Sequence, residues 1–165
     1  MIGDRVDPWR GYNFSVSLTD STSALSIAFS LSSSPAIGSF SECSGLDKTL
    51  QTEDYPEGGN NALVRKFPSR VTWSNIRLRR GVATNDQLWL WHDSFVQGNG
   101  TRRDGVISLL DEQQNAVKVW RFTRGLPVKY VGPSMNANQS AVAIEELEIG
   151  HEGIRLLQSG LFGLF

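Results

Sequence analysis

The sequence predicts a mainly β fold, an antiparallel β-sandwich or small barrel with one flanking α-helix. Apolar residues recur at every second position along most of the chain, which is the period of a half-buried strand. The segment 84–98 departs from that period and has the spacing of an amphipathic helix. We therefore expect about seven or eight strands in a single domain over residues 1–165, with the helix between the fourth and fifth strands.

The strands before the helix follow from alternation and from turn signals. Segment 12–18 (YNFSVSL) alternates apolar with polar residues, and 24–31 (ALSIAFSL) repeats the pattern after a run of turn formers, which predicts a hairpin. A short strand is expected within 39–47. In 70–81 the apolar phase changes near Ser74–Asn75, which we interpret as a β-bulge.

The helix is expected at about residues 85–97. Thr84 followed by Gln87 resembles a capping box, and Gly98 and Gly100 provide a stop. The residues expected to pack the core, or the helix against it, are Trp73, Leu88, Trp91, Phe95 and Trp120. Trp89 and Trp91 cannot share one helix face, so at least one of them should lie at the core's margin or face away from it.

The strands after the helix begin with a hairpin. Segments 105–111 and 116–125 flank the turn sequence EQQN, and 126–132 and 140–157 each supply a further strand. The last of these slips phase, with Val142 on one side and Leu147 on the other.

Composition excludes several classes of protein. The net charge of −1 gives no basic excess for nucleic-acid binding. No secretory signal and no membrane-spanning apolar run is visible in the sequence. Cys43 is the sole cysteine, which rules out an internal disulfide and fits a reducing compartment.

Catalytic and metal signals are weak. His92 lies on the expected helix, and His151 follows an acidic strand, so a metal site would have to combine it with Glu148 or Glu152. Cys43 lacks the surroundings of a nucleophile. We expect no enzyme activity, no metal and no cofactor.

The distribution of charge along the chain is more informative than these catalytic and metal signals. Residues 64–80 hold six basic residues and no acid, and residues 145–152 hold four acids and no Lys or Arg. They are either two solvated strand faces, or a basic edge of one subunit that meets an acidic edge of the next and closes a ring.

Residues 53–70 (EDYPEGGNNALVRKFPSR) are too polar for the core and too long for a tight turn. A long polar loop inside a compact domain is usually functional. This segment is therefore a candidate interaction site.

Together, YNFSVSL, GSFSECSGLD, EDYPEGGNN…VRKFPSR, NIRLRRGV…NDQLWLWHDSF and the stretch from ISLLDEQQN to GHEGI resemble the tail tube family. These are the inner tube proteins of contractile phage tails and of phage-tail-like contractile injection systems. The resemblance runs in order from about residue 9 to residue 156.

The resemblance implies hexameric rings whose sheets join into a β-barrel around a channel. Rings stack into a tube inside a contractile sheath, and contraction drives the tube through a target envelope. The implied partners are further copies of the chain, the sheath protein, the baseplate hub or spike, and cargo proteins or DNA in the lumen. Segment 53–70 would contact the adjacent ring.

The residues expected at contacts between subunits or rings are Tyr55, Glu57, Gly58, Gly59, Asn60, Asn61, Arg65, Lys66, Arg70, Arg79, Arg80, Glu145, Glu146 and Glu148. Two features depart from the family: a possible extra hairpin at 19–37 and an apolar tail at 158–165. They leave open a specialised initiator ring at the baseplate. Alternatives from other classes are a monomeric β-sandwich that binds sugars or peptides through its tryptophans, and a hydrolase that uses a histidine.

Overall fold

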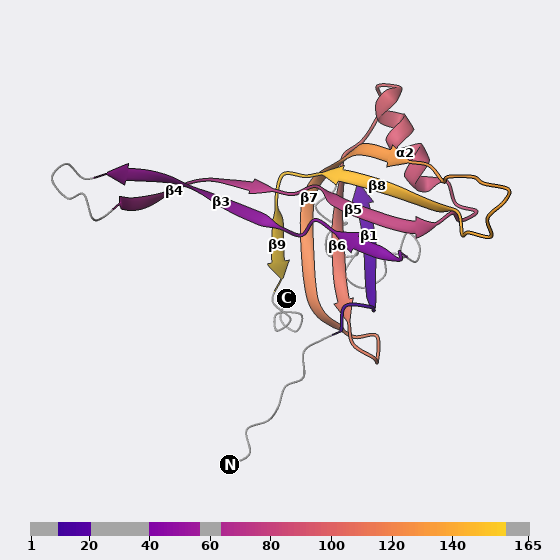
Figure 1. Cartoon of the computed structure of the whole chain (residues 1–165), viewed down its shortest axis with the longest axis horizontal. Coiled ribbons are helices and arrows are strands. Elements are labelled where there is room, and N and C mark those ends of the chain that lie inside the picture. Colours follow the sequence, from indigo (N-terminus) through magenta and orange to yellow (C-terminus); the bar gives the residue numbers. More distant parts are fainter. Residues whose placement is uncertain (1–9, 21–39, 57–63, 158–165) are drawn as a thin grey trace, which may run out of the picture.

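The computed structural model describes residues 10–20, 40–56 and 64–157. These ranges contain nine strands and one helix (Figure 1). The elements are β1 (Phe14–Asp20), β2 (Glu42–Ser44), β3 (Lys48–Pro56), β4 (Val64–Trp73), β5 (Ile76–Gly81), α2 (Gln87–Val96), β6 (Arg103–Leu110), β7 (Ala116–Val131), β8 (Ile144–Gly150) and β9 (Ile154–Leu157).

Seven strands form one antiparallel sheet in the order β1-β6-β7-β8-β5-β2, with β9 paired to β7 beside this path. The remaining two strands, β3 and β4, pair only with each other. The mainly β antiparallel fold with a flanking helix is thus confirmed. Within the described ranges the sheet is open, so the chain does not close a small barrel by itself.

Strand β7 connects two arms of this sheet. One arm consists of β1, β6, β9 and the first half of β7, and the other consists of the second half of β7 with β8, β5 and β2. Its first half pairs with β6 on one side and with β9 on the other, and its second half pairs with β8. The sequence predicts separate strands at 116–125 and 126–132, but in the structure they are one continuous strand, Ala116–Val131. Arg124 adopts a positive φ of 52° just before Gly125, where the strand passes from one arm to the other.

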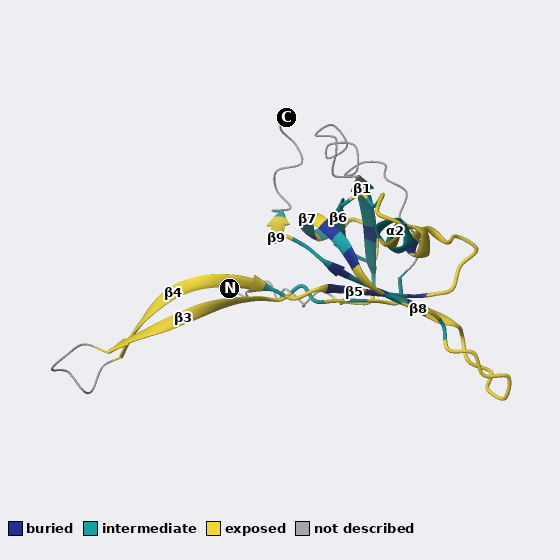
Figure 2. Ribbon diagram, turned by 90° about the horizontal axis from the view of Figure 1, so that it is seen from above, coloured by how far each residue is buried: buried dark blue, intermediate teal, exposed yellow. Residues whose placement is uncertain are grey.

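The core fills the space between the arms and under the helix (Figure 2). Its buried members are Val16, Ile76, Leu78, Leu88, Trp91, Ile107, Phe122, Leu147, Ile149 and Ile154. Trp73, Phe95 and Trp120 are partly buried against this cluster, so all five residues expected to pack the core or the helix do so.

The helix has a different start from the predicted one. Asp86 is its N-cap residue but makes no side-chain cap bond, and the Asn85 side chain accepts from the Gln87 amide over 2.8 Å. The capping box of Thr84 and Gln87 was therefore wrong. Trp91 ties the helix to the chain beyond it, because its indole nitrogen donates to the Thr101 carbonyl over 2.9 Å.

Segment 53–70 is not a long loop. Apart from residues 57–63, which lie outside the described ranges, it belongs to the paired strands β3 and β4. Ser74 and Asn75 are not a bulge either, since they form the joint at which the chain leaves β4 for β5 in another sheet. The phase change was real, and its cause is a change of sheet.

Three expectations lie outside the described residues in whole or in large part. They are the strand at 24–31, the extra hairpin at 19–37, of which only residues 19 and 20 are described, and the tail at 158–165.

Candidate assembly surfaces

The β3–β4 ribbon projects from the body, and all of its described residues are exposed except the partly buried Trp73 (Figure 2). Leu50, Tyr55, Val64, Phe67 and Val71 are all large apolar side chains that are about half exposed. An isolated two-stranded hairpin is marginally stable in water. Such a ribbon is therefore suited to packing against another surface.

The ribbon is ordered by contacts between its own side chains. The rings of Tyr55 and Phe67 meet edge to face, with centroids 6.0 Å apart. Lys66 pairs with Asp54 over 3.0 Å. Of the predicted contact residues, the ribbon exposes Tyr55, Arg65, Lys66 and Arg70, whereas Glu57, Gly58, Gly59, Asn60 and Asn61 lie outside the described ranges.

The two charge runs meet within one chain, across the neighbouring strands β5 and β8. The cross-strand partners are Arg77 with Glu148, Arg79 with Glu146 and Arg80 with Glu145. The first pair has a closest distance of 3.8 Å and the second of 3.6 Å. Arg79 also reaches Glu42 on β2 over 2.9 Å.

Arg80 and Glu145 correct the expectation that these residues meet another subunit. Their side chains are only 2% and 7% exposed. The Tyr130 hydroxyl donates to Glu145 Oε2 over 2.7 Å, and Arg80 also donates to the Asn85 carbonyl over 2.8 Å. Burial and the adjacent Glu145 raise the pKa of Tyr130 to about 12. This pair holds β5, β7, β8 and the start of α2 together.

The face of β1 and β6 that points away from the core is mainly polar, with Val106 as an apolar member. Val16 and Ile107 are register partners and both are buried, so the alternate residues lie on the opposite face. These residues include Ser15 opposite Ser108, Ser17 opposite Val106 and Thr19 opposite Asp104. On β7 the same face carries Arg121, which pairs with Asp104 over 2.9 Å.

Helix α2 exposes three large apolar side chains, those of Trp89, Leu90 and Val96. Trp91 is 3% exposed and Trp89 is 50% exposed, which confirms that one of the two tryptophans faces away from the core. Leu90 and Val96 are exposed beside it. The Trp89 ring packs edge to face on Tyr130, with centroids 5.2 Å apart.

The residues considered for catalysis have structural surroundings. Burial raises the pKa of Cys43 to about 11, which keeps the thiol protonated and unreactive. His151 bonds to backbone groups of Ser74 and Gly153. Among the described residues, no group of three or more metal-ligating side chains is close enough to hold an ion.

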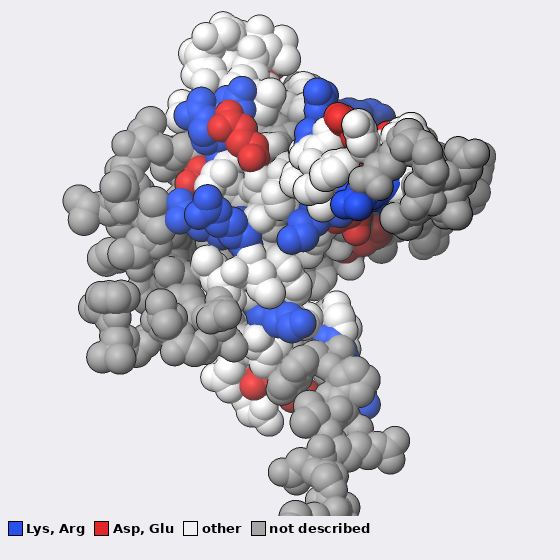
Figure 3. Space-filling view, turned by 90° about the vertical axis from the view of Figure 1, so that its left-hand side faces the viewer, with Lys and Arg blue, Asp and Glu red and all other residues white. Residues whose placement is uncertain are grey.

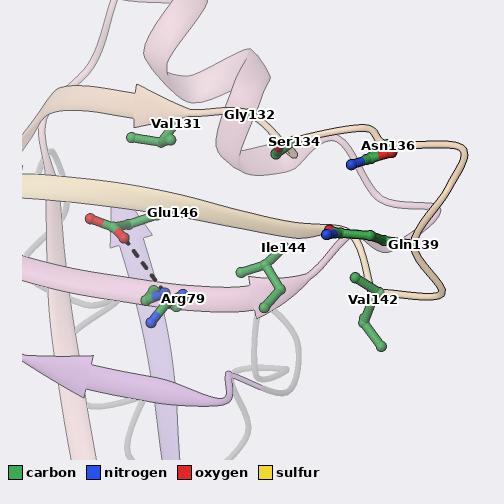
Figure 4. A pocket seen from close by; sticks show the side chains of 10 residues that line it. Arg79, Val131, Gly132, Ser134, Asn136, Gln139, Val142, Ile144 and Glu146 are labelled. Atoms are coloured by element: carbon green, nitrogen blue, oxygen red, sulfur yellow. Dashed lines mark ion pairs between the residues drawn. The ribbon is translucent and has the colours of Figure 1, made fainter.

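An open pocket of about 340 Å³ lies between the ends of β5 and β8 and the connection from β7 to β8 (Figure 4). Its lining residues are Arg79, Val131, Gly132, Ser134, Asn136, Gln139, Ala141, Val142, Ile144 and Glu146. The two charged members, Arg79 and Glu146, pair with each other. The pocket therefore offers no unbalanced charge to a small ionic ligand.

The view from the ribbon side shows Lys and Arg atoms in several separate groups, some beside Asp or Glu atoms (Figure 3). On this face, the described basic residues do not merge into the single basic patch that is typical of a nucleic-acid binder. The described helix is too short to cross a membrane.

Comparison with known proteins finds one family model that matches most of the chain. Residues 10–155 match the family model described as "T4-like virus tail tube protein gp19". No curated protein sequence matches the chain.

Solved structures from contractile particles share the fold. A chain in the anti-feeding prophage (AFP) baseplate is 25% identical with a TM-score of 0.80, and the match covers 94% of this chain and 99% of that one. A chain in the sheath-tube complex of the extracellular contractile injection system PVC is 24% identical with a TM-score of 0.74, covering 92% of each chain. A chain in the AFP tube-terminating cap is 22% identical with a TM-score of 0.75, covering 96% of this chain and 100% of that one.

Proposed function

The chain belongs to the T4-like virus tail tube protein gp19 family, and from this we propose that it is a structural subunit of the inner tube of a contractile injection system or phage tail. Residues 1–165 act as one tail-tube domain. Six copies form a ring, rings stack into a hollow tube, and a contracting sheath drives that tube through a target envelope. This role needs no catalysis and no cofactor.

The observation that carries the proposal is the open sheet combined with the projecting ribbon. Within the described ranges, β1 and β2 each pair on one side only. A row of unpaired backbone groups favours pairing with another chain, and closure into a ring removes such edges. Joining β1 of one subunit to the β9 side of the next would make a continuous barrel from the β1-β6-β7-β9 arms.

The polar face of that arm supports its assignment to the channel. Ser15, Ser17 and Ser108 are small, and Arg121 is neutralised by Asp104. Val106 and the buried Val119 are apolar members of the same face. The other groups named here are small or charge-paired, and they give cargo few apolar contacts that would hold it. The cargo of this channel would be effector proteins or DNA moving without sequence recognition.

The ribbon supports contact between rings. It extends away from the body, and its exposed apolar residues gain most if a neighbouring subunit covers them. We propose that it packs against the adjacent ring, with Tyr55, Arg65, Lys66 and Arg70 in the contact. Arg79, Glu146 and Glu148, which are less exposed, would contribute from the outer face of β5 and β8.

A second candidate is a specialised initiator ring at the baseplate. It is favoured by the likeness to a chain of the AFP baseplate structure at a TM-score of 0.80. In either role the subunit would assemble in the bacterial cytoplasm and then become part of a tail-like particle with sheath and baseplate as partners.

Electron microscopy of the purified protein tests both candidates. A main tube subunit should form sixfold rings that polymerise into long tubes, whereas an initiator should stop at a single ring. Monomers at high concentration, without rings or tubes, would contradict both.

A further inference from the structure

The direction of the β3–β4 ribbon is set at its base. The last ribbon pair is Lys48 with Trp73, and just beyond it the Ser74 amide donates to the Asp47 carbonyl over 3.2 Å. Farther out, every described ribbon residue is exposed. The side chains that contact Trp73 and Ser74 therefore hold the ribbon against the body.

His151 is such a side chain. It lies in the short connection between β8 and β9, and its Nε2 is 3.0 Å from the Ser74 carbonyl oxygen. Its ring meets the rings of Trp73 and Phe122, with centroids 6.2 and 6.0 Å away. One imidazole thus touches the end of the ribbon and a core residue of β7.

The hydrogen bonds require a neutral ring. The Gly153 amide donates to His151 Nδ1 over 3.2 Å, so Nδ1 carries no proton. The remaining proton lies on Nε2, which donates it to the Ser74 carbonyl. Protonation would place a second N–H opposite the Gly153 N–H, and the ring would have to turn out of this position.

We propose that neutral His151 is a positioning residue that fixes the direction of the β3–β4 ribbon, and that its protonation in acid releases the ribbon. The inference rests on the proposed function, because ribbon direction matters where the ribbon meets a neighbouring ring. The tube would then assemble near neutral pH and lose its contacts between rings in acid.

Two of the carboxylates near the ring, Glu148 and Glu152, already have partners. On β8, Glu148 lies near Arg77 and accepts from Asn75; after the ring, Glu152 pairs with Arg102 and Arg124; at the ribbon base lie Asp47 and Lys48. Burial lowers the pKa of His151 from its usual value near 6.5. The ordered arrangement is therefore complete above about pH 6.5 and is lost as the pH falls through the lower folded-state value.

Spin-label distances on the monomer test the release directly. In a Cys43→Ser background, labels at Gln51→Cys on the ribbon and Glu112→Cys on the body report ribbon direction by pulsed electron resonance. We expect one narrow distance distribution at about pH 8 and a broad one at the most acid pH at which the protein stays folded. The matched variant His151→Gln keeps a donor for the Ser74 carbonyl but does not titrate, so its distribution should stay narrow at both.

The outcomes are separable. Two results overturn the inference even if tubes form. One is a narrow distance distribution at both pH values in the protein that retains His151, and the other is equal broadening in acid in His151→Gln. Broadening confined to the histidine protein supports it, and tubes of that protein should dissociate in acid while His151→Gln tubes persist. The absence of tubes at every pH would instead overturn the proposed function and leave the ribbon result standing. If His151→Gln fails to fold, His151→Asn, which keeps the acceptor for Gly153, replaces it in the same comparison.

Discussion

Arg80 and Glu145 form an ion pair on the core face of the sheet, directly in line with apolar partners on the same two strands. Along β5 and β8 the register pairs Ile76 with Ile149, then Leu78 with Leu147, then Arg80 with Glu145, and all six residues are buried. The charges therefore occupy positions that strand alternation assigns to the interior. Tyr130 completes the site by donating to Glu145.

Removing one charge from this pair should destabilise the fold. Glu145→Ala leaves the Arg80 guanidinium buried opposite no carboxylate, and we expect a loss of about 3–5 kcal/mol in the free energy of unfolding. The control is Glu146→Ala on the same strand, because the partner of Glu146, Arg79, is 43% exposed. This substitution should lower the free energy of unfolding by less than about 1 kcal/mol. Urea unfolding of the monomeric protein measures both. Equal effects of the two substitutions would contradict the buried pair.

Tyr130 should give the protein an alkaline limit. Its folded-state pKa is about 12, above the ordinary 10.0, because of burial and the bond to Glu145. A raised pKa stabilises the fold below the unfolded value of about 10, and that contribution is lost as the pH rises toward 12. Thermal unfolding across this range should show a decline that is smaller in Tyr130→Phe. Parallel declines in the two proteins would show that another group is responsible.

The sequence predicted the elements that show a clear periodicity within one segment. It did not predict features that depend on which strands pair with each other. The alternation in 12–18 and the turn EQQN correctly indicated β1 and the β6–β7 hairpin. The break at Ser74–Asn75 was visible, but periodicity cannot tell a bulge from a strand that moves to another sheet. Glycine and asparagine at 57–63 suggested a loop over all of 53–70, because an exposed ribbon has no buried face to impose alternation.

The burial of Arg80 and Glu145 could have been predicted from the sequence. Arg80 is in phase with Ile76 and Leu78, and Glu145 is in phase with Leu147 and Ile149. That shared phase was the missed signal, since charge runs alone favoured two surfaces. The roles of His151 and of the polar face of β1 and β6 could not be predicted, because both depend on contacts across the fold.

Gly45 should tolerate no side chain. Its φ is +86°, and an added Cβ would lie only 1.9 Å from the Asn75 carbonyl oxygen, which is backbone and cannot move aside. Gly45→Ala should therefore cost about 3–5 kcal/mol or prevent folding, as expected for a backbone clash combined with a strained φ. Gly11→Ala is the control, because no atom lies within 4 Å of its added Cβ. A Gly45→Ala protein as stable as Gly11→Ala would show that the 45–47 segment passes Asn75 at a greater distance.

The ribbon should matter for assembly and not for the fold of the subunit. Tyr55 and Phe67 are 59% and 52% exposed, and they contact each other on one face of the ribbon. Replacing both with alanine should leave the unfolding free energy of the monomer within about 1 kcal/mol, because exposed side chains contribute little. If the pair is covered by the adjacent ring, its loss should cost at least about 2 kcal/mol per contact, which raises the concentration needed for tube growth about thirtyfold. Sedimentation over a concentration series measures this, with Tyr12→Ala, 65% exposed on the body, as the control. Tubes that grow at the same concentration with and without the aromatic pair would remove this face of the ribbon from the contact between rings.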